Sequence, residues 1–216
     1  MRFLLACVLV LMIALIGGCT TNQGANSSYQ TVLPSPNRDT QRARVMTEKA
    51  HNELRGGNLT GAEKSLTEAL QADTFYGPAH NNLGLLYYRQ KKFYLAAWEF
   101  QYASKLMPFR PQPRNNLGLV LEAVGKPAEA CTEYEEAAKL EPDNPEFVGN
   151  LARGLVRQGQ KNERIRGLLQ QVVLKDTRPD WVDWARLELV TMPATAPAGG
   201  PEQPASMPAD DAEGPE

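Results

Sequence analysis

The pentapeptide Asn-Asn-Leu-Gly-Leu occurs twice in this chain of 216 residues, starting at Asn81 and again at Asn115, an interval of 34 residues. Small, aromatic and proline residues recur at the same interval. The recurring pairs are Gly84 and Gly118, Ala96 and Ala130, Phe100 and Tyr134, Ala103 and Ala137, and Pro108 and Pro142. Continuing the step in both directions gives four units, at residues 43–76, 77–110, 111–144 and 145–178. Such a chain buries its apolar surface by stacking neighbouring units, so we expect a linear array.

The third unit shows what each repeat folds into. Apolar side chains follow one another at helical spacing at Leu117, Val120, Leu121 and Val124. Gly125 then supplies a left-handed residue that ends the helix, and Pro127 fits the first turn of a second helix. Gly118 lets two antiparallel helices approach closely, and Tyr134 fills the space between them. The sequence therefore predicts a helical hairpin in each unit.

The period and its signature positions resemble the tetratricopeptide repeat. The second unit, from Asn81 to Pro108, matches nearly every position, and the third departs mainly at Leu121 and Pro127. The end units depart further, with Lys49 where the second unit has a leucine and Arg164 where a small residue is typical. The resemblance implies an all-α fold, a right-handed solenoid of about four helical hairpins that binds other proteins.

Two further segments follow the fourth unit. Residues 179–190 predict an amphipathic helix that caps the solenoid, with Asp180 as its N-cap. The side chains expected to cover the exposed end are Trp181, Trp184, Leu187 and Val190. Residues 191–216 are dominated by Pro, Ala, Gly and acidic residues and contain no Lys or Arg, a composition that predicts a disordered tail.

Residues 1–18 predict an export signal. One basic residue precedes an apolar run from Phe3 to Ile16, which is short for a transmembrane helix. The ending Ile-Gly-Gly-Cys resembles the bacterial lipobox, which implies that Cys19 carries a lipid and begins the mature chain. A plain transmembrane anchor and an ordinary cleaved signal are the alternatives.

Several acyl chains on Cys19 would anchor the chain to a membrane without embedding it. Thr20 follows the cysteine in place of the aspartate that resembling inner-membrane lipoproteins carry. We therefore expect attachment to the outer membrane, facing the periplasm, in a host with two membranes. Residues 19–42 are expected to form a flexible tether.

Composition offers little for catalysis. Cys7 belongs to the signal and Cys19 to the anchor, so Cys131 is the third and last cysteine and no disulfide framework can form. His51 and His80 have no further Cys, Asp or His at ligand spacing. The sequence therefore predicts no catalytic residues, no metal site, no cofactor and no small-molecule substrate, and the chain is not expected to be an enzyme.

Charge also limits the partners. Residues 38–190 hold 22 Lys and Arg side chains against 20 Asp and Glu, a balance too even for a nucleic-acid protein. The partners expected are proteins of the cell envelope and, through the lipid, the membrane.

The resemblance implies that the first helix of each unit lines a peptide-binding groove. The implied positions are Asn82, Leu85, Tyr88, Arg89, Asn116, Leu119, Glu122, Asn150, Arg153 and Arg157, with Glu48, His51 and Arg55 in the first unit. Asn82, Asn116 and Asn150 share one register, and an amide offers a donor and an acceptor to a peptide backbone. The alternative is that asparagine is common at this position whether or not a peptide binds.

A second surface is expected on the second helix of the second unit. Tyr94, Trp98 and Tyr102 recur four residues apart, where the neighbouring units carry small, polar or charged residues. Three rings on a convex face predict an apolar contact patch for a protein. The alternatives are that the tether or the tail covers the patch, or that rotation of the helix buries it.

This architecture is similar to the pilotin-type lipoproteins of type IV pili and to the assembly lipoproteins of Tad pili. The function expected is a membrane-anchored scaffold that assists assembly of an envelope complex such as a pilus or a secretin. An adaptor for cell-wall enzymes or secretion machinery in the periplasm is the alternative, because it needs the same fold and a different partner.

Overall fold

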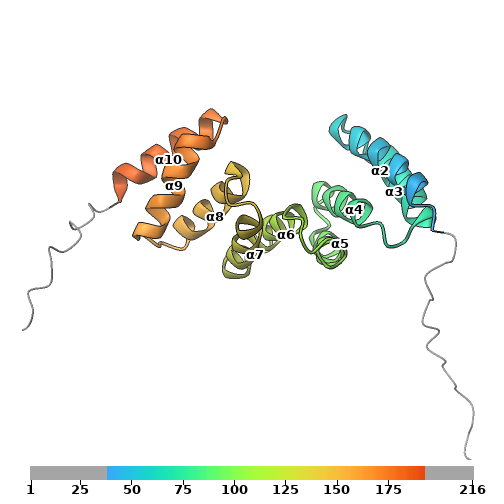
Figure 1. Cartoon of the computed structure of the whole chain (residues 1–216), viewed down its shortest axis with the longest axis horizontal. Coiled ribbons are helices and arrows are strands. Elements are labelled where there is room, and N and C mark those ends of the chain that lie inside the picture. Colours follow the sequence, from blue (N-terminus) through green and yellow to red (C-terminus); the bar gives the residue numbers. More distant parts are fainter. Residues whose placement is uncertain (1–37, 193–216) are drawn as a thin grey trace, which may run out of the picture. The chain divides into compact units, whose positions relative to one another are not determined.

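The computed structural model describes residues 38–192, in which every regular element is an α-helix (Figure 1). The helices are α2 (Thr40–Arg55), α3 (Leu59–Ala72), α4 (Gly77–Arg89), α5 (Phe93–Leu106), α6 (Gln112–Ala123), α7 (Pro127–Leu140), α8 (Pro145–Arg157), α9 (Glu163–Lys175) and α10 (Pro179–Thr191). The export signal, Cys19, most of the tether and the tail from residue 193 lie outside the described residues.

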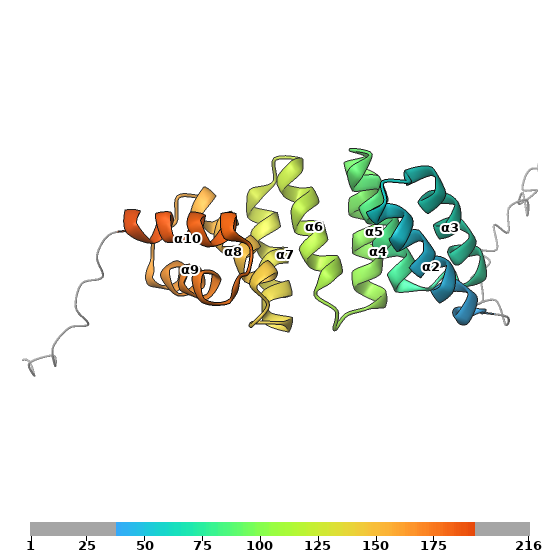
Figure 2. The same ribbon diagram turned by 90° about the horizontal axis from the view of Figure 1, so that it is seen from above.

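Consecutive helices pack as antiparallel pairs, α2 with α3, α4 with α5, α6 with α7 and α8 with α9. Each pair packs on the next along the chain, and α10 packs against α9 (Figure 2). The expected all-α solenoid of helical hairpins is confirmed.

The turn inside each hairpin depends on a left-handed residue. Gly57, Gly125 and Gly159 have φ angles of 79°, 76° and 76°, a conformation that glycine adopts without steric cost. The same repeat position in the second hairpin holds Lys91, whose φ is 59°. Three hairpins therefore use the residue that suits the turn, and the second carries backbone strain there.

Small residues allow the two helices of a hairpin to touch. A Cβ atom added to Gly118 would lie 2.4 Å from a ring carbon of Tyr134, and one added to Gly84 would lie 2.6 Å from the ring of Phe100. Both rings are fully buried. The glycine and the aromatic side chain of each unit thus occupy the same space, which explains why they recur together.

The first helix begins three residues before the expected start of the first unit. The carboxylate of Asp39 accepts a hydrogen bond from the backbone N–H of Arg42 at 2.8 Å and caps α2. Residues 40–42, expected in the tether, are therefore helical, because a capped turn satisfies backbone donors that a free tether leaves to water.

The last helix differs from its prediction in two ways. Its N-cap is Arg178, and Asp180 lies in the first turn. Leu187 and Val190 are exposed and cover nothing, whereas Trp181 packs against the core. Since α10 begins 34 residues after α8, it occupies the position of the first helix of a further unit. In this position Leu187 and Val190 lie on the side of the helix that faces solvent.

No helix among residues 38–192 is long and apolar enough to cross a membrane.

Candidate functional site

Two pockets open on the side of the solenoid formed by the first helices. The first, of about 390 Å³, is lined by Arg44, Thr47, Glu48, His51, Asn52, Tyr76, Pro78 and Asn82. The second, of about 470 Å³, is lined by Arg153, Val156, Arg157, Asp180, Trp181, Trp184 and Glu188. Of the residues expected in the groove, Glu48, His51 and Asn82 line the first pocket. Arg153 and Arg157 line the second. Arg55 is exposed and lines neither pocket.

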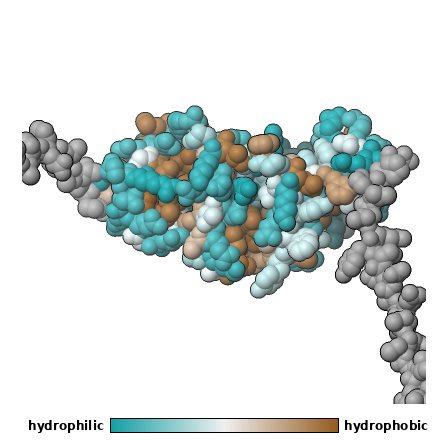
Figure 3. Space-filling view, turned by 60° about the horizontal axis from the view of Figure 1, so that its bottom comes forward, coloured by the Kyte–Doolittle hydropathy of each residue, from teal (hydrophilic) through white to brown (hydrophobic). Residues whose placement is uncertain are grey.

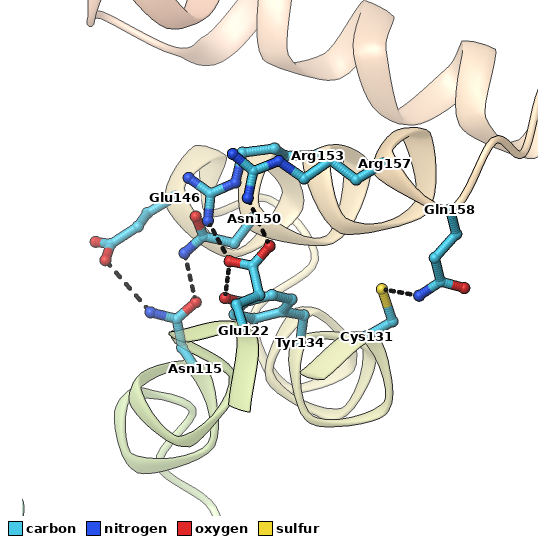
Figure 4. A network of polar contacts seen from close by, with 9 residues as sticks. All are labelled: Asn115, Glu122, Cys131, Tyr134, Glu146, Asn150, Arg153, Arg157 and Gln158. Atoms are coloured by element: carbon cyan, nitrogen blue, oxygen red, sulfur yellow. Dashed lines mark hydrogen bonds and ion pairs between the residues drawn. The ribbon is translucent and has the colours of Figure 1, made fainter. Parts of the chain in front are cut away.

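The asparagines join neighbouring units. Asn150 Nδ2 donates to Asn115 Oδ1 at 2.7 Å, and Asn116 Nδ2 donates to Asn81 Oδ1 at 3.0 Å (Figure 4 shows the first pair). Asn82 Nδ2 donates in the same way to the backbone carbonyl of a first-unit residue at 3.5 Å. Each bond links positions 35 residues apart, so the second asparagine of one unit reaches back to the unit before it.

These contacts correct the expected amide ladder. Asn150 is only 4% exposed, and its Nδ2 donates to Asn115, so this side chain is turned toward the preceding unit and not toward a bound peptide. Asn115 is also buried, and its own Nδ2 lies 3.5 Å from Glu146 Oε1. The asparagines hold adjacent first helices in register, and of the three ladder positions Asn82 is the one that lines either of these two pockets.

Glu122 on α6 connects three helices. Its Oε2 accepts hydrogen bonds from Tyr134 Oη and from Arg153 Nη2, both at 2.8 Å, and its Oε1 pairs with Arg157 Nη1 at 3.3 Å (Figure 4). Burial is the main cause that raises the pKa of the Tyr134 phenol well above its usual range, and the hydrogen bond to the Glu122 carboxylate raises it further. Glu122 therefore fixes the two arginines that form one wall of the second pocket.

The opposite wall of the second pocket is aromatic. The guanidinium of Arg153 lies 5.0 Å from the centre of the Trp181 ring, and that of Arg178 lies 4.3 Å from it. Trp184 meets the first indole edge-on, with ring centres 5.8 Å apart. A Cβ atom on Gly149 would lie 3.0 Å from the Trp181 ring, so the lack of a side chain at this position of α8 leaves room for the indole.

This aromatic wall is the part of the site that the sequence interpretation missed. The sequence predicts that Trp181 and Trp184 cover the end of the solenoid, and both do pack against the core there, but they also line this pocket. The 34-residue step places them on a helix equivalent to α8, which could have indicated this second role. A pocket lined by two indoles together with arginine and carboxylate groups suits an extended peptide, which can place an apolar side chain against the indoles and its polar backbone near the charged groups.

The remaining groove positions pack against other residues of the solenoid, within their own hairpin or on the preceding one. Leu85 and Leu119 are half-buried against the core clusters. Tyr88 lies beside Phe93 with ring centres 5.8 Å apart. Arg89 Nη1 donates to the carbonyl of Leu54 in the preceding hairpin. The structure therefore brings these side chains into contact with protein, and none lines either pocket.

The aromatic patch on α5 contains two of its three expected members. Tyr94 is 89% exposed and Trp98 is 70% exposed. Tyr102 is partly buried, because its ring packs edge-on against His80 with centres 4.6 Å apart. That histidine is held by Glu99 Oε2 at 2.7 Å from its Nδ1. Rotation of the helix thus removes Tyr102 from the patch.

Cys131 is buried, and its Sγ lies 3.0 Å from Nε2 of Gln158, the residue that follows α8. Burial raises the pKa of its thiol, which makes it a poor nucleophile. Within the described part of the chain, no three His, Cys, Asp or Glu side chains form a group that could hold a metal ion.

Two family models match the chain, both described as tetratricopeptide repeat, one over residues 47–111 and the other over residues 111–144. Residues 47–144 therefore match the tetratricopeptide repeat, and they make up the solenoid from within α2 to the end of α7. No curated protein matches the chain.

Solved structures agree with this fold. The first tetratricopeptide domain of Spaghetti (RPAP3), bound to the HSP90 peptide SRMEEVD, is similar at 26% identity with a TM-score of 0.54 over 58% of this chain and 99% of that one. The O-GlcNAc transferase of Thermobaculum terrenum is similar at 26% identity with a TM-score of 0.57, over 68% of this chain but 27% of the transferase. YrrB, a tetratricopeptide protein with an unusual peptide-binding site, shares the fold at 19% identity with a TM-score of 0.54, over 67% of this chain and 77% of its own. Repeats of this kind commonly form protein-interaction scaffolds, which is the role that the repeats of this chain imply.

Proposed function

We propose that this protein is a membrane-anchored scaffold that binds extended segments of partner proteins while an envelope complex, such as a pilus or a secretin, is assembled. The observation that carries the proposal is the pair of pockets on the side of the first helices, one near each end of the described solenoid. The peptide bound by the similar RPAP3 domain supports a peptide as the ligand. No catalytic step is assigned to the chain.

The two pockets differ in chemistry, which gives a bound segment a direction. The first is lined by His51, Glu48 and Asn82, whose side chains can bind backbone and small polar groups. The second holds two indoles and suits an apolar or aromatic side chain. The hydrogen bonds between asparagines keep the first helices in register, so the spacing of the pockets is fixed before a partner arrives.

Site-specific photo-crosslinking tests the groove in living cells. A photoreactive phenylalanine derivative would replace the exposed His51 or Arg157, each of which lines a pocket. The matched control replaces Thr132, an exposed residue of α7 that lines neither. We expect the two groove positions to crosslink to the same envelope proteins and the control position to crosslink to none of them. Equal crosslinking from Thr132 would exclude the groove as the binding site.

The identity of the crosslinked proteins decides between assembly of a pilus or secretin and the adaptor role. Pilus or secretin subunits support the proposal, whereas cell-wall hydrolases would replace it.

The membrane anchor is proposed from Cys19 and the apolar run before it. Mass spectrometry of the chain extracted from membranes should find a lipidated cysteine as the first residue. Cys19→Ser should abolish both the lipid and the partition of the chain into detergent. An unmodified terminus at another residue would rule out a lipoprotein. Fractionation of inner and outer membranes tests the expected attachment to the outer one.

A further inference from the structure

The exposed side of α5 combines aromatic and basic residues. Tyr94 and Trp98 are joined there by Leu95, which is about half exposed. The basic side chains on α5 and its flanks, all exposed, are Lys91, Lys92, Lys105 and Arg110. The single acid between residues 91 and 110 is Glu99, which is turned inward against His80. This surface therefore carries positive charge with no exposed carboxylate of its own.

The equivalent helices of the neighbouring units are different. Residues 125–144, which contain α7, hold two bases and six acids, and residues 57–76, which contain α3, hold one base and three acids. Neither helix has an aromatic residue on its exposed side. Packing does not require the rings either, because Ala96, Phe100 and Ala103 supply the buried side of α5. The combination is a property of this unit and not of the fold.

The two kinds of residue lie on one stripe. Tyr94, Trp98 and Lys105 follow one another at intervals of four and seven residues, which places them on one side of a helix. Lys91 lies at the start of the stripe and shares a shallow pocket with Tyr94. Figure 3, which brings the lower side of Figure 1 forward, shows hydrophobic and intermediate residues among the hydrophilic ones on that side of the solenoid.

We propose that this side of α5 is a lipid-docking face that rests on an anionic membrane surface. Indole and phenol rings prefer the interface between headgroups and acyl chains, and lysines beside them pair with anionic headgroups. Because the stripe runs along one outward side of α5, all of its residues can contact a flat membrane surface together. The stripe has no exposed carboxylate, so anionic headgroups would not repel it. The face would orient the solenoid at the membrane, and it does not depend on a lipid at Cys19.

Fluorescence quenching by the bilayer tests the contact directly. The full chain would be mixed with vesicles of phosphatidylglycerol and phosphatidylethanolamine whose acyl chains carry bromine, a quencher of indole fluorescence. Residues 3–16 are apolar enough to hold the chain on the vesicle, so the readout is quenching and not co-sedimentation. We expect strong quenching that Trp98→Phe largely removes, because Trp181 and Trp184 line the pocket of α10.

The charge dependence is tested in the same assay. Lys91→Glu combined with Lys105→Glu should weaken the contact about tenfold or more. Lys64→Glu on α3 is the matched control and should leave quenching unchanged. Vesicles of phosphatidylcholine should quench weakly. Thermal unfolding checks that each variant is folded, which the exposure of all four positions favours. Equal quenching of wild type and Trp98→Phe overturns the proposal. It is also overturned if the lipid does not quench Trp98 and this face of α5 binds an envelope protein instead.

Discussion

Glu122→Gln should destabilise the solenoid, because one carboxylate holds α6, α7 and α8 together. The side chain of Glu122 is 14% exposed and that of Arg153 is 24% exposed, so their pair is poorly screened by water. A hydrogen bond to a charged group contributes about 1.5 to 3 kcal/mol, and that of the Tyr134 phenol is one of these. The pair with Arg157, which is 64% exposed, adds less than about 1 kcal/mol.

Glutamine keeps an acceptor for Tyr134 but leaves Arg153 without its counter-charge. We therefore expect a loss of about 2 to 4 kcal/mol in the free energy of unfolding. For an array of this size the melting temperature should fall by roughly 5 to 15 °C. Circular dichroism at 222 nm, the usual helical band, would follow the transition.

The matched control is Glu129→Gln on α7. Glu129 is exposed and pairs only locally, with Lys126 at 2.9 Å, so its substitution should change stability by less than about 0.5 kcal/mol. If the two variants melt at the same temperature, the Glu122 network does not stabilise the solenoid and the reasoning from burial and charge is wrong.

Three further predictions test the fold. Lys91→Gly should stabilise by about 1 kcal/mol, seen as a higher melting temperature, because glycine adopts the left-handed φ of 59° without strain; no change would show that the turn is unstrained. Asn150→Ala should cost about 1 to 3 kcal/mol in urea unfolding, because it leaves the buried Asn115 Oδ1 unpaired, and Asn115→Ala should then add little more; fully additive losses would contradict the pairing. The hydrogen bond from Arg178 lowers the pKa of the buried Asp176 carboxyl below its usual 3.8, so its contribution is present above about pH 4 and is lost as the pH falls through the folded-state pKa. Asp176→Asn should therefore flatten the acid limb of a plot of stability against pH, and an unchanged limb would assign acid unfolding to other groups.

The hairpins could be predicted from the sequence because their causes are local. Gly125 and Pro127 set the turn between two helices within three residues. The pair Gly118 and Tyr134 has its equivalent in the second unit, where the residues are Gly84 and Phe100. This joint recurrence predicts a close contact between the two positions. Periodicity carries this information because each helix places every third or fourth residue on one side.

The partners of the groove residues could not be predicted in the same way. The repeat period is 34 residues, but the asparagine bonds join positions 35 residues apart, such as Asn81 and Asn116. These bonds join non-equivalent positions of neighbouring hairpins, and which positions meet there depends on packing over the whole interface. Packing between helices also explains why Tyr102 does not belong to the predicted patch, because the orientation of α5 places its ring against His80 on α4.

By itself, therefore, the sequence determined the helical hairpins, their order and the contacts inside each one, because these follow from residue spacing along a single helix. The tertiary structure alone decided which side chains remain free to bind. It turned Asn150 inward, placed Trp181 and Trp184 opposite Arg153 in a pocket, and left Tyr94 and Trp98 outside. Those outcomes depend on the rotation and offset between separate helices, and the packing that sets them acts between residues far apart in the chain.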